Sequence, residues 1–452
     1  MKIQRKTATA REASFHILLQ FATRTKRLDE LIRHEFETSG LSDRDKKMIV
    51  TLTHGVVKNL TLLDWRLTAV YHGDWQKALH KLKTIMRLAA YEIDFLDFIP
   101  PHATINEYVN LAKKCIFKNS GNVVNGVMRN YLRRRKQLDP DKRFKHPETQ
   151  IELKYSVPQW LVQRWIHLWG IEHTAKMCAA FNTRPLFDLK INLNIIRLEE
   201  FEQILVENGI TFMRSDYFPD LIKLSDIQTV RNLKLFKKGY CLVQDESARL
   251  AVEMLELHKG EKVLDACAAP GGKIRVMHQL MADSILTVGM DIDRRRIKFL
   301  RENFAGMSCL STCRVVQGDG RQPPFKGEFD KILVDAPCSG LGTLQKNPDI
   351  KWRRTLEDIY SFQRLQIDIL NGICELLADN GVMVYSTCTI DPGENEEVVA
   401  GFLQHQNGRF KTIRPPLSLR NFWGEDDAIR TFPHIHWMDG AFSIRLARSD
   451  AI

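Results

Sequence analysis

The sequence lacks several features that define common classes of protein. No stretch approaches 18 consecutive apolar residues, so we expect no transmembrane helix. The opening segment MKIQRKTATAREAS is basic but has no apolar core, so we expect no secretory signal. Low-complexity tracts and internal repeats are also absent. A chain of 452 residues with this composition predicts a cytoplasmic protein of two or three domains.

Cysteine is present, but not in a pattern that binds metal. The chain has nine cysteines and no CxxC pair. Cys309 and Cys313 are four positions apart, with no histidine or second pair nearby, so we expect no zinc and no other metal. A disulfide framework is not expected in a cytoplasmic chain of this size. Most of the cysteines are predicted to be small buried apolar residues.

The charge is strongly positive. The formal net charge is +11, which favours a polyanionic partner. Two runs are densely basic, YLRRRKQ at 131–137 and DRRRIK at 293–298. Each run is consistent with phosphate contact or with a solvated helix face, and the sequence leaves both interpretations open.

The first part of the chain is predicted to be entirely helical. Over residues 1–138, segments such as LDELIRHEF and LKTIMRLAAYEIDFL repeat apolar residues at helical spacing, without β-alternation. The prolines of IPP at 99–101 predict a break between two helices. Two residue pairs have the form of helix N-caps: Ser42 with Asp45, and Thr104 with Glu107.

The rest of the chain changes pattern twice. The polar segment LDPDKRFKHPETQ at 138–150 predicts a linker, followed by a small α+β module up to about residue 225. From about residue 226, short apolar strands alternate with helices, which predicts a parallel, doubly wound α/β sheet. In such sheets, ligands bind beyond the carboxyl ends of the strands.

Several polar groups follow predicted strands directly. The segment DACAAPGGK at 265–273 closes one strand and opens a helix, but it is neither a P-loop nor a GxGxxG turn. Its glycines allow close backbone approach to a ligand, although an ordinary strand–helix turn is an alternative. Asp291, Asp319 and Asp335 end three later strands. Carboxylates without basic partners suit a ribose-bearing sulfonium, such as S-adenosylmethionine, better than a pyrophosphate.

Two cysteines also stand at predicted strand ends, Cys338 in DAPCSG and Cys388 in YSTCT. They could be buried structural residues, a redox pair or catalytic groups, and their polar turns beside the proposed cofactor pocket favour catalysis. A thiolate that adds to carbon 6 of cytosine makes carbon 5 nucleophilic enough to attack a methyl group. A neighbouring acid would hydrogen-bond N3 as charge develops. Spacing alone does not rank the two cysteines.

Three long motifs, DACAAPGGK, DAPCSGLGTLQKNPDIKW and YSTCTIDPGENEE, resemble in this order the motifs of the RsmB/NOP family of RNA cytosine-C5 methyltransferases. IPPHATINEYVNLAK and GVMRNYLRR are similar to the family's NusB-like domain, and YSVPQWLVQRW, RPLFDLKIN and VQDESA to its intervening module. The resemblance implies a NusB-like all-α RNA-binding domain at 1–138, a linker and small α+β RNA-binding module at 139–225, and a Rossmann-like class I methyltransferase domain at 226–452.

The resemblance also implies a role for each site residue. Asp291 would bind the ribose, Asp319 would lie beside the adenine, and Asp335 would lie between cofactor and cytosine. Cys388 would be the nucleophile, and Cys338 would assist release of the product. S-adenosylmethionine would be held by the turn of Cys267, Ala268, Ala269, Pro270, Gly271, Gly272 and Lys273.

Two residues depart from the family pattern, Ala266 and Thr389, and both changes are conservative. The implied activity is methylation of one cytosine in 16S ribosomal RNA, with phosphate contacts from the helical domain, the linker and the basic runs. The target base must be unstacked to admit attack. A transfer RNA target and a non-catalytic RNA-binding assembly factor are the alternatives. We expect a monomer.

Overall fold

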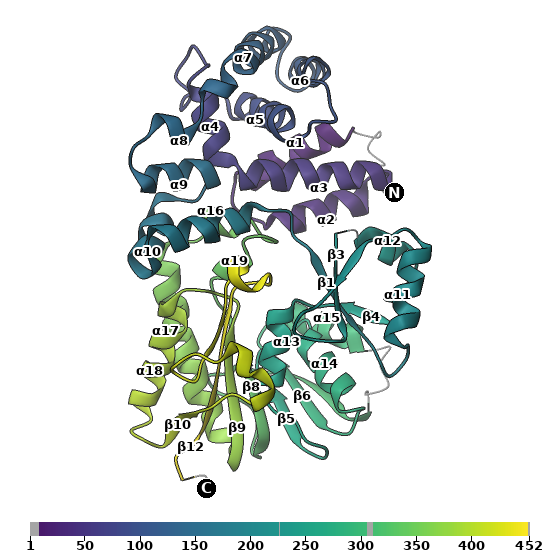
Figure 1. Cartoon of the computed structure of the whole chain (residues 1–452), viewed down its shortest axis with the longest axis vertical. Coiled ribbons are helices and arrows are strands. Elements are labelled where there is room, and N and C mark those ends of the chain that lie inside the picture. Colours follow the sequence, from purple (N-terminus) through teal and green to yellow (C-terminus); the bar gives the residue numbers. More distant parts are fainter. Residues whose placement is uncertain (1–8, 226, 305–310, 451–452) are drawn as a thin grey trace. The chain divides into compact units, whose positions relative to one another are not determined.

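The computed structural model describes residues 9–225, 227–304 and 311–450, so Cys309 lies outside the described residues. The chain forms two compact units (Figure 1). The helical unit comprises Met1–Asn182 with Asn347–Arg353, and the catalytic unit comprises Thr183–Lys346 with Arg354–Ile452. The division between the units, after Asn182, does not coincide with the predicted domain boundaries at 138/139 and 225/226. Those boundaries therefore stay predictions.

In the helical unit, buried residues between Ala10 and Leu138 form a hydrophobic core. Phe15, Tyr108 and Tyr131 lie in it with at most 1% of their surface exposed. No helix in the described parts of the chain is long and apolar enough to cross a membrane. Within the described part of 1–138, the all-helical prediction is confirmed. The helices are α1 (Ala10–Phe21), α2 (Leu28–Thr38), α3 (Asp43–Lys58), α4 (Leu60–Thr68), α5 (His80–Phe95), α6 (Pro101–Cys115), α7 (Ser120–Arg134), α8 (Pro140–Arg143), α9 (Pro147–Tyr155), α10 (Gln159–Asn182) and α16 (Ile350–Arg353).

One of the two predicted N-caps is confirmed and the other is wrong. Ser42 Oγ accepts a hydrogen bond from the Asp45 amide at 3.2 Å and donates one to the Asp45 carboxylate at 2.6 Å, at the start of α3. Thr104 instead lies inside α6, where its hydroxyl donates to Glu92 Oε1 at 2.7 Å. The helix begins earlier, at Pro101, because proline suits the first helical position, where its missing N–H is not needed.

Proline also explains why the predicted linker is helical. The segment 138–150 contains α8 and the first part of α9. Pro140 and Pro147 stand in the first turns of these two helices, where proline is favoured rather than disruptive. Polarity and proline therefore mark helix starts in this segment, and its role as a linker between domains stays a prediction.

A short segment from the NPDIKW motif belongs to the helical unit. Lys351 Nζ donates to the carbonyls of Lys58 at 2.9 Å and Tyr155 at 3.3 Å, which end α3 and α9. Trp352 Nε1 donates to the Val57 carbonyl at 2.8 Å. The last carbonyls of a helix have no partner within the helix, and a cation near them is favourable. The segment therefore caps two helices far from it in the sequence.

The catalytic unit contains a small four-stranded sheet. Its strand order is β2-β3-β1-β4, and every pair is antiparallel. Together with two helices, these strands confirm the predicted small α+β module. The elements are β1 (Phe187–Ile191), α11 (Leu198–Glu207), β2 (Phe212–Arg214), β3 (Leu221–Leu224), α12 (Ile227–Asn232) and β4 (Cys241–Val243).

The larger sheet has the strand order β10-β12-β9-β8-β5-β6-β7, with β11 paired to β12. The five strands from β5 to β9 are parallel, as predicted, whereas β10, β11 and β12 are antiparallel to their partners. The parallel sheet is therefore confirmed for the strands that the sequence predicted, and the last strands, which follow the final motif and had not been assigned, add antiparallel pairs. The strands are β5 (Lys262–Asp265), β6 (Leu286–Asp291), β7 (Cys313–Gln317), β8 (Phe329–Asp335), β9 (Leu377–Thr387), β10 (Phe410–Ile413), β11 (Ile429–Thr431) and β12 (Ala441–Arg448).

Helices cover both faces of this sheet (Figure 1). Along β5, Val263 packs into the core with α13 (Glu246–Glu253), α14 (Gly272–Leu280) and α15 (Arg294–Phe304). The next residue, Leu264, packs on the other face with α17 (Leu356–Ile373) and α18 (Glu396–His405). Because the parallel strands share one direction, their carboxyl ends meet at one edge of the sheet, where the predicted site residues lie.

Candidate active site

The turn between β5 and α14 is tight and held against the end of β6. Gly271 has φ +100°, and a Cβ there would lie 2.6 Å from Leu300 Cδ1, so the position requires glycine. The Ala268 amide donates to the Met290 carbonyl at 2.8 Å, and the Ala269 amide donates to the Asp291 carboxylate at 3.3 Å. The structure therefore brings this turn and Asp291 together, as the sequence predicted.

Asp291 is buried at the end of β6, with 3% of its surface exposed. Besides the turn, its carboxylate accepts the Asp293 amide at 3.0 Å and pairs with Arg296 Nη1 at 3.3 Å. The next residue, Ile292, is 57% exposed although it is apolar. A fixed acceptor beside an exposed apolar side chain fits a ligand with a polar sugar and an apolar ring.

The premise that the carboxylates lack basic partners is wrong. Asp319, two residues beyond β7, forms an ion pair with Arg321 at 2.7 Å, and this hydrogen-bonded guanidinium lowers the pKa of Asp319. Asp291 likewise pairs with Arg296. Arg296 belongs to the basic run at 293–298 and Arg321 follows Asp319 by two residues, but the sequence did not show that they pair with these acids. Carboxylate charge alone therefore does not argue for a sulfonium.

The third acid, Asp335, pairs with Lys273 across the edge of the sheet. Lys273 Nζ lies 2.5 Å from Asp335 Oδ2. Burial opposes the charged amine, but Asp335, Asp265 and Cys388 together raise the pKa of Lys273, so it is an ammonium ion. Asp265 is itself buried, and burial with the charge of Asp335 raises its pKa to about 7. The sequence predicted that Lys273 belongs to the cofactor turn, but it did not indicate that Lys273 pairs with Asp335.

The two predicted cysteines lie side by side. Cys338 Sγ is 3.3 Å from Cys388 Sγ, because the turns that carry them follow the adjacent parallel strands β8 and β9. Cys388 is exposed, whereas Cys338 is half-buried. The hydrogen bond with Cys388, burial and the charge of Glu394 raise the pKa of Cys338 well above its usual value. Cys338 therefore keeps its proton at neutral pH.

A buried network holds both thiol turns in place. Glu394 Oε2 accepts the Ser339 amide at 2.7 Å and Gln366 Nε2 at 3.2 Å, and Gln366 also donates to the Pro337 carbonyl at 2.9 Å. Ser339 Oγ donates to Thr389 Oγ1 at 2.9 Å, which links the two turns. Burial raises the pKa of Glu394 to about 7. The sequence analysis missed these positioning residues, although Glu394 lies in its third motif.

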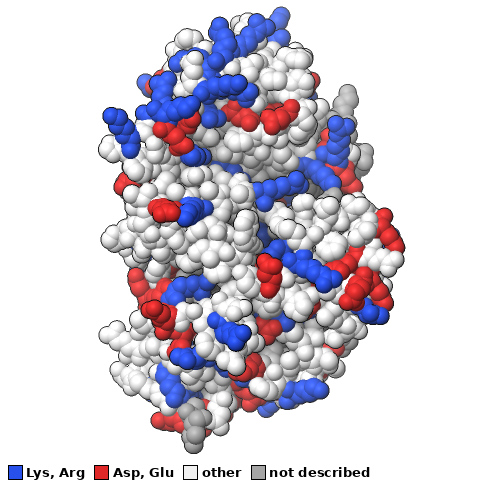
Figure 2. All heavy atoms as spheres, in the orientation of Figure 1, with Lys and Arg blue, Asp and Glu red and all other residues white. Residues whose placement is uncertain are grey.

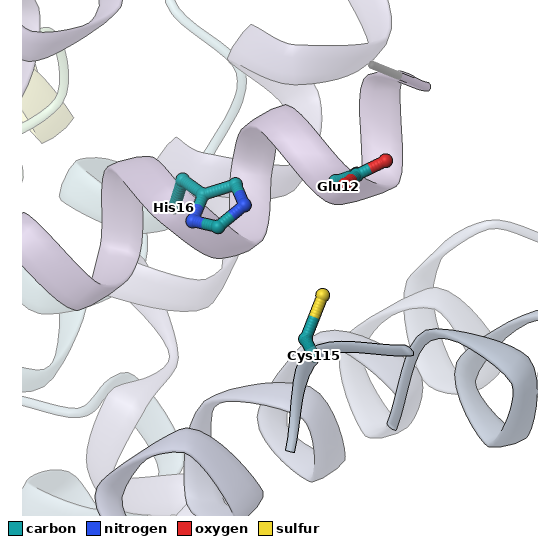
Figure 3. A group of neighbouring side chains, drawn as sticks. All are labelled: Glu12, His16 and Cys115. Carbon is teal, nitrogen blue, oxygen red and sulfur yellow. The ribbon is translucent and has the colours of Figure 1, made fainter. Parts of the chain in front are cut away.

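Among the residues that the structure describes, one group has the composition of a metal site. The donor atoms of Glu12, His16 and Cys115 lie within 4.8 Å of one another (Figure 3). Glu12 already pairs with Lys114 at 2.8 Å, and burial with the charge of Glu12 raises the pKa of Cys115, which disfavours the thiolate that a metal needs. We assign this group no metal, and the absence of a metal stays a prediction.

Three family models match the chain in sequence order. Residues 8–133 match the NusB family, and 157–231 match the ferredoxin-like domain described as Methyltr_RsmF/B-like. Residues 252–447 match the 16S rRNA methyltransferase RsmB/F. The match of 157–231 begins before the catalytic unit, so the family domains and the compact units do not share boundaries.

Two crystal structures share the fold. That of PH0851 is 23% identical and superposes with a TM-score of 0.79 over 98% of this chain and all of its own. NSun6 from Pyrococcus horikoshii, solved with SFG, is 22% identical, with a TM-score of 0.58 over 65% of this chain and 98% of its own. At these identities the likeness concerns the fold alone.

Sequence relatives match over nearly the whole chain. A protein of Synechocystis named "Probable ribosomal RNA small subunit methyltransferase B" is 32% identical over 98% of this chain and 100% of its own. The Bacillus subtilis protein of the same name is 30% identical over 97% of this chain and 98% of its own. The "Ribosomal RNA small subunit methyltransferase B" of Klebsiella pneumoniae is 32% identical over 80% of this chain and 82% of its own. By these full-length matches, the chain belongs to the 16S rRNA methyltransferase RsmB/F family.

Proposed function

We propose that this protein transfers a methyl group from S-adenosylmethionine to carbon 5 of a cytosine in 16S ribosomal RNA, in the cytoplasm. The observation that carries the proposal is the pair of thiols, 3.3 Å apart, at the same sheet edge as the Lys273–Asp335 ion pair and the turn after β5. Membership of the RsmB/F family supports both the RNA substrate and the methyl donor.

The residues at this edge fit S-adenosylmethionine. Asp291 offers a fixed buried acceptor for ribose hydroxyls, and the exposed Ile292 next to it suits an adenine ring. The turn from Cys267 to Lys273 brings backbone close to the same place, and Asp319 would lie beside the adenine. When bound, S-adenosylmethionine supplies an electrophilic methyl group. A structural neighbour solved with SFG, an analogue of this cofactor, supports the assignment.

Cys388 is the proposed nucleophile. It is the exposed member of the thiol pair, so its sulfur can reach a substrate and attack it as the thiolate. The Lys273 ammonium contributes positive charge that favours this thiolate. Attack by sulfur on carbon 6 forms the C–S bond and moves the electrons of the 5,6 double bond onto carbon 5 and the ring.

Asp335 and Lys273 would stabilise the charge that develops on the base. Asp335 is held by Lys273 at 2.5 Å, so its carboxyl is fixed rather than free to turn. A group placed in advance against developing charge is the largest common source of rate enhancement. Asp335 would accept a hydrogen bond from the N4 amine of the cytosine, next to N3, and the ammonium would balance negative charge on the ring.

Cys338 would act after methylation. The carbon 5 proton must then pass to a base such as water. Its electron pair restores the 5,6 double bond as the bond between Cys388 and carbon 6 breaks, which frees the RNA. Cys338 carries a proton and lies beside the Cys388 sulfur, so it can protonate the departing thiolate. Without this step the RNA would remain bound covalently.

Methyl transfer to unmodified RNA tests the proposal. The full chain is incubated with methyl-labelled S-adenosylmethionine and 16S ribosomal RNA transcript, in parallel with unmodified transfer RNA, and nucleosides are resolved by mass spectrometry. We expect 5-methylcytidine at one position of the 16S RNA. Label on transfer RNA alone, on another atom, or on neither RNA contradicts the proposal.

A further inference from the structure

The helical unit has a cavity of about 550 Å³ between the segment after α4 and one face of α7. The mechanism above uses none of its residues. Five aromatic or polar side chains line it, those of Tyr71, His72, Asn122, Asn130 and Arg133, and the rest of the lining is Gly73, Val123, Gly126 and Val127. Its volume is in the range of cavities that bind small ligands, about 300–1,000 Å³.

One wall is the surface of α7. Asn122, Gly126 and Asn130 follow one another at intervals of four residues, so they lie on one helix face, and Arg133 continues that face. A Cβ built on Gly126 would meet nothing within 4 Å, so open space lies directly over this glycine. The helix therefore presents two amides and a guanidinium around a hollow.

The facing wall is fixed to the same helix. Arg134 Nη1 donates to the Ala69 carbonyl at 3.0 Å, and Asn130 Nδ2 donates to the Val70 carbonyl at 3.4 Å. The ring of Tyr71 packs edge-on against the buried Trp75, with centroids 5.6 Å apart. The aromatic wall is therefore held in position before a ligand arrives, which reduces the entropy lost on binding.

The basic run 131–137 divides into two groups. Arg134 and Arg135 are structural, since Arg135 donates to the Ile93 carbonyl and pairs with Asp94 at 3.0 Å. Arg133 is exposed and lines the cavity. In Figure 2, Lys and Arg side chains gather over the α6–α7 end of this unit. The residues of this run therefore do not share one role, and the choice between a solvated helix face and phosphate contact has to be made for each residue separately.

We propose that this cavity binds one unstacked nucleotide of the RNA substrate. Tyr71 would stack on the base, since aromatic side chains commonly receive splayed-out bases in single-stranded RNA. The amides of Asn122 and Asn130 supply both donors and acceptors for base edges. Arg133 would contact the phosphate. That the RNA is 16S ribosomal RNA rests on the proposed function.

Filling the cavity without changing charge tests the proposal. Gly126→Leu places a side chain in the open space, and leucine is a better helix former than glycine, so the variant should fold. Binding of the full chain to 16S RNA transcript is measured at several salt concentrations. Loss of one stacked base should weaken binding about 5- to 100-fold, with an unchanged dependence on salt. Gly126→Ala should have a smaller effect.

A matched pair of arginine variants separates the cavity from general attraction. Arg133→Ala removes a positive charge from the wall of the cavity. Arg129→Ala removes a positive charge from an exposed position of α7 that does not line the cavity. Each lost phosphate contact should reduce the salt slope by about 0.7. We expect Arg133→Ala to weaken binding more than Arg129→Ala. Equal effects of the two, with Gly126→Leu binding like the unchanged protein, would contradict the subsite.

The outcomes also distinguish this inference from the proposed function. Normal methyl transfer with no effect of Gly126→Leu on RNA affinity contradicts the subsite alone. Weaker RNA binding by Gly126→Leu, from a protein that transfers no methyl group, supports the subsite and contradicts the proposed activity. As a last measurement, free ribonucleoside monophosphates are titrated into the full chain. If these monophosphates bind saturably while Gly126→Leu has no effect on RNA binding, the cavity binds a small metabolite instead.

Discussion

Cys338 Sγ and Cys388 Sγ lie 3.3 Å apart, although the residues are 50 positions apart in the chain. Parallel pairing of β8 with β9 places the turns that carry them next to each other. The thiols differ in exposure, and burial with their mutual hydrogen bond raises the pKa of Cys338. The pair is therefore asymmetric before any substrate binds, which supports one attacking and one proton-bearing thiol.

Removal of the Lys273 amine should slow chemistry more than it weakens cofactor binding. Because Lys273 Nζ holds Asp335, Lys273→Ala should lower kcat by roughly 10²- to 10⁴-fold. Affinity for S-adenosylmethionine, measured by calorimetry, should change little. Lys259→Ala, an exposed lysine just before β5 at the opposite end of the strand, is the control. A large loss of cofactor affinity with unchanged kcat would instead show that the Lys273 amine contacts S-adenosylmethionine.

Glu394 should make folding stability fall as pH rises. Its carboxyl has a pKa of about 7 in the folded protein, against 4.5 as the ordinary value, because it is buried. Between these values the folded protein holds a proton that the unfolded chain releases, so stability decreases with rising pH. The full effect is on the order of 3 kcal/mol.

Glu394→Gln is the neutral variant that isolates this effect. Its amide oxygen can still accept from Ser339 and Gln366, so the turn should keep its shape. Denaturant unfolding at pH 5 and pH 8 should show a smaller loss of stability for the variant than for the unchanged protein. Asp265 titrates similarly in both proteins and cancels in the comparison. Identical pH profiles would mean that Glu394 is ionised throughout.

Trp352 should stabilise the helical unit, although the catalytic motifs surround it in the sequence. Its ring packs against the helical core and its N–H donates to Val57. Trp352→Ala should lower stability by about 2–4 kcal/mol and speed amide hydrogen exchange at the end of α3. Phe98→Ala, at an apolar residue of the same unit that is 76% exposed, should cost less than about 0.5 kcal/mol. Equal exchange rates in both variants would show that the segment is not docked.

The sequence predicted the residues that local patterns determine. Short apolar runs between helical segments located the parallel strands. We expected Asp291, Asp335 and the cysteines to lie together because the carboxyl ends of parallel strands share one edge of the sheet. Thr104 was misassigned because an earlier proline starts the helix. The antiparallel strands near the C-terminus were missed because they follow the last motif.

Tertiary contacts could not be read from the sequence. Lys273 and Asp335 are 62 residues apart and meet only once β5 and β8 are paired. Glu394 meets Ser339, and Gln366 meets Pro337 and Glu394, from two other elements. The ranking of the thiols likewise depended on exposure and mutual hydrogen bonding, which spacing does not contain. The family resemblance supplied that ranking before the fold gave it physical support.

Trapping of the covalent intermediate tests the central claim, that Cys388 attacks and Cys338 releases. Each cysteine is replaced by alanine in the full chain, with Cys115→Ala in the helical unit as the control for loss of a thiol. The proteins are incubated with 16S RNA transcript and S-adenosylmethionine and run on a denaturing gel. We predict a stable protein–RNA adduct with Cys338→Ala, none with Cys388→Ala, and normal turnover with Cys115→Ala. An adduct with Cys388→Ala and none with Cys338→Ala would contradict the account.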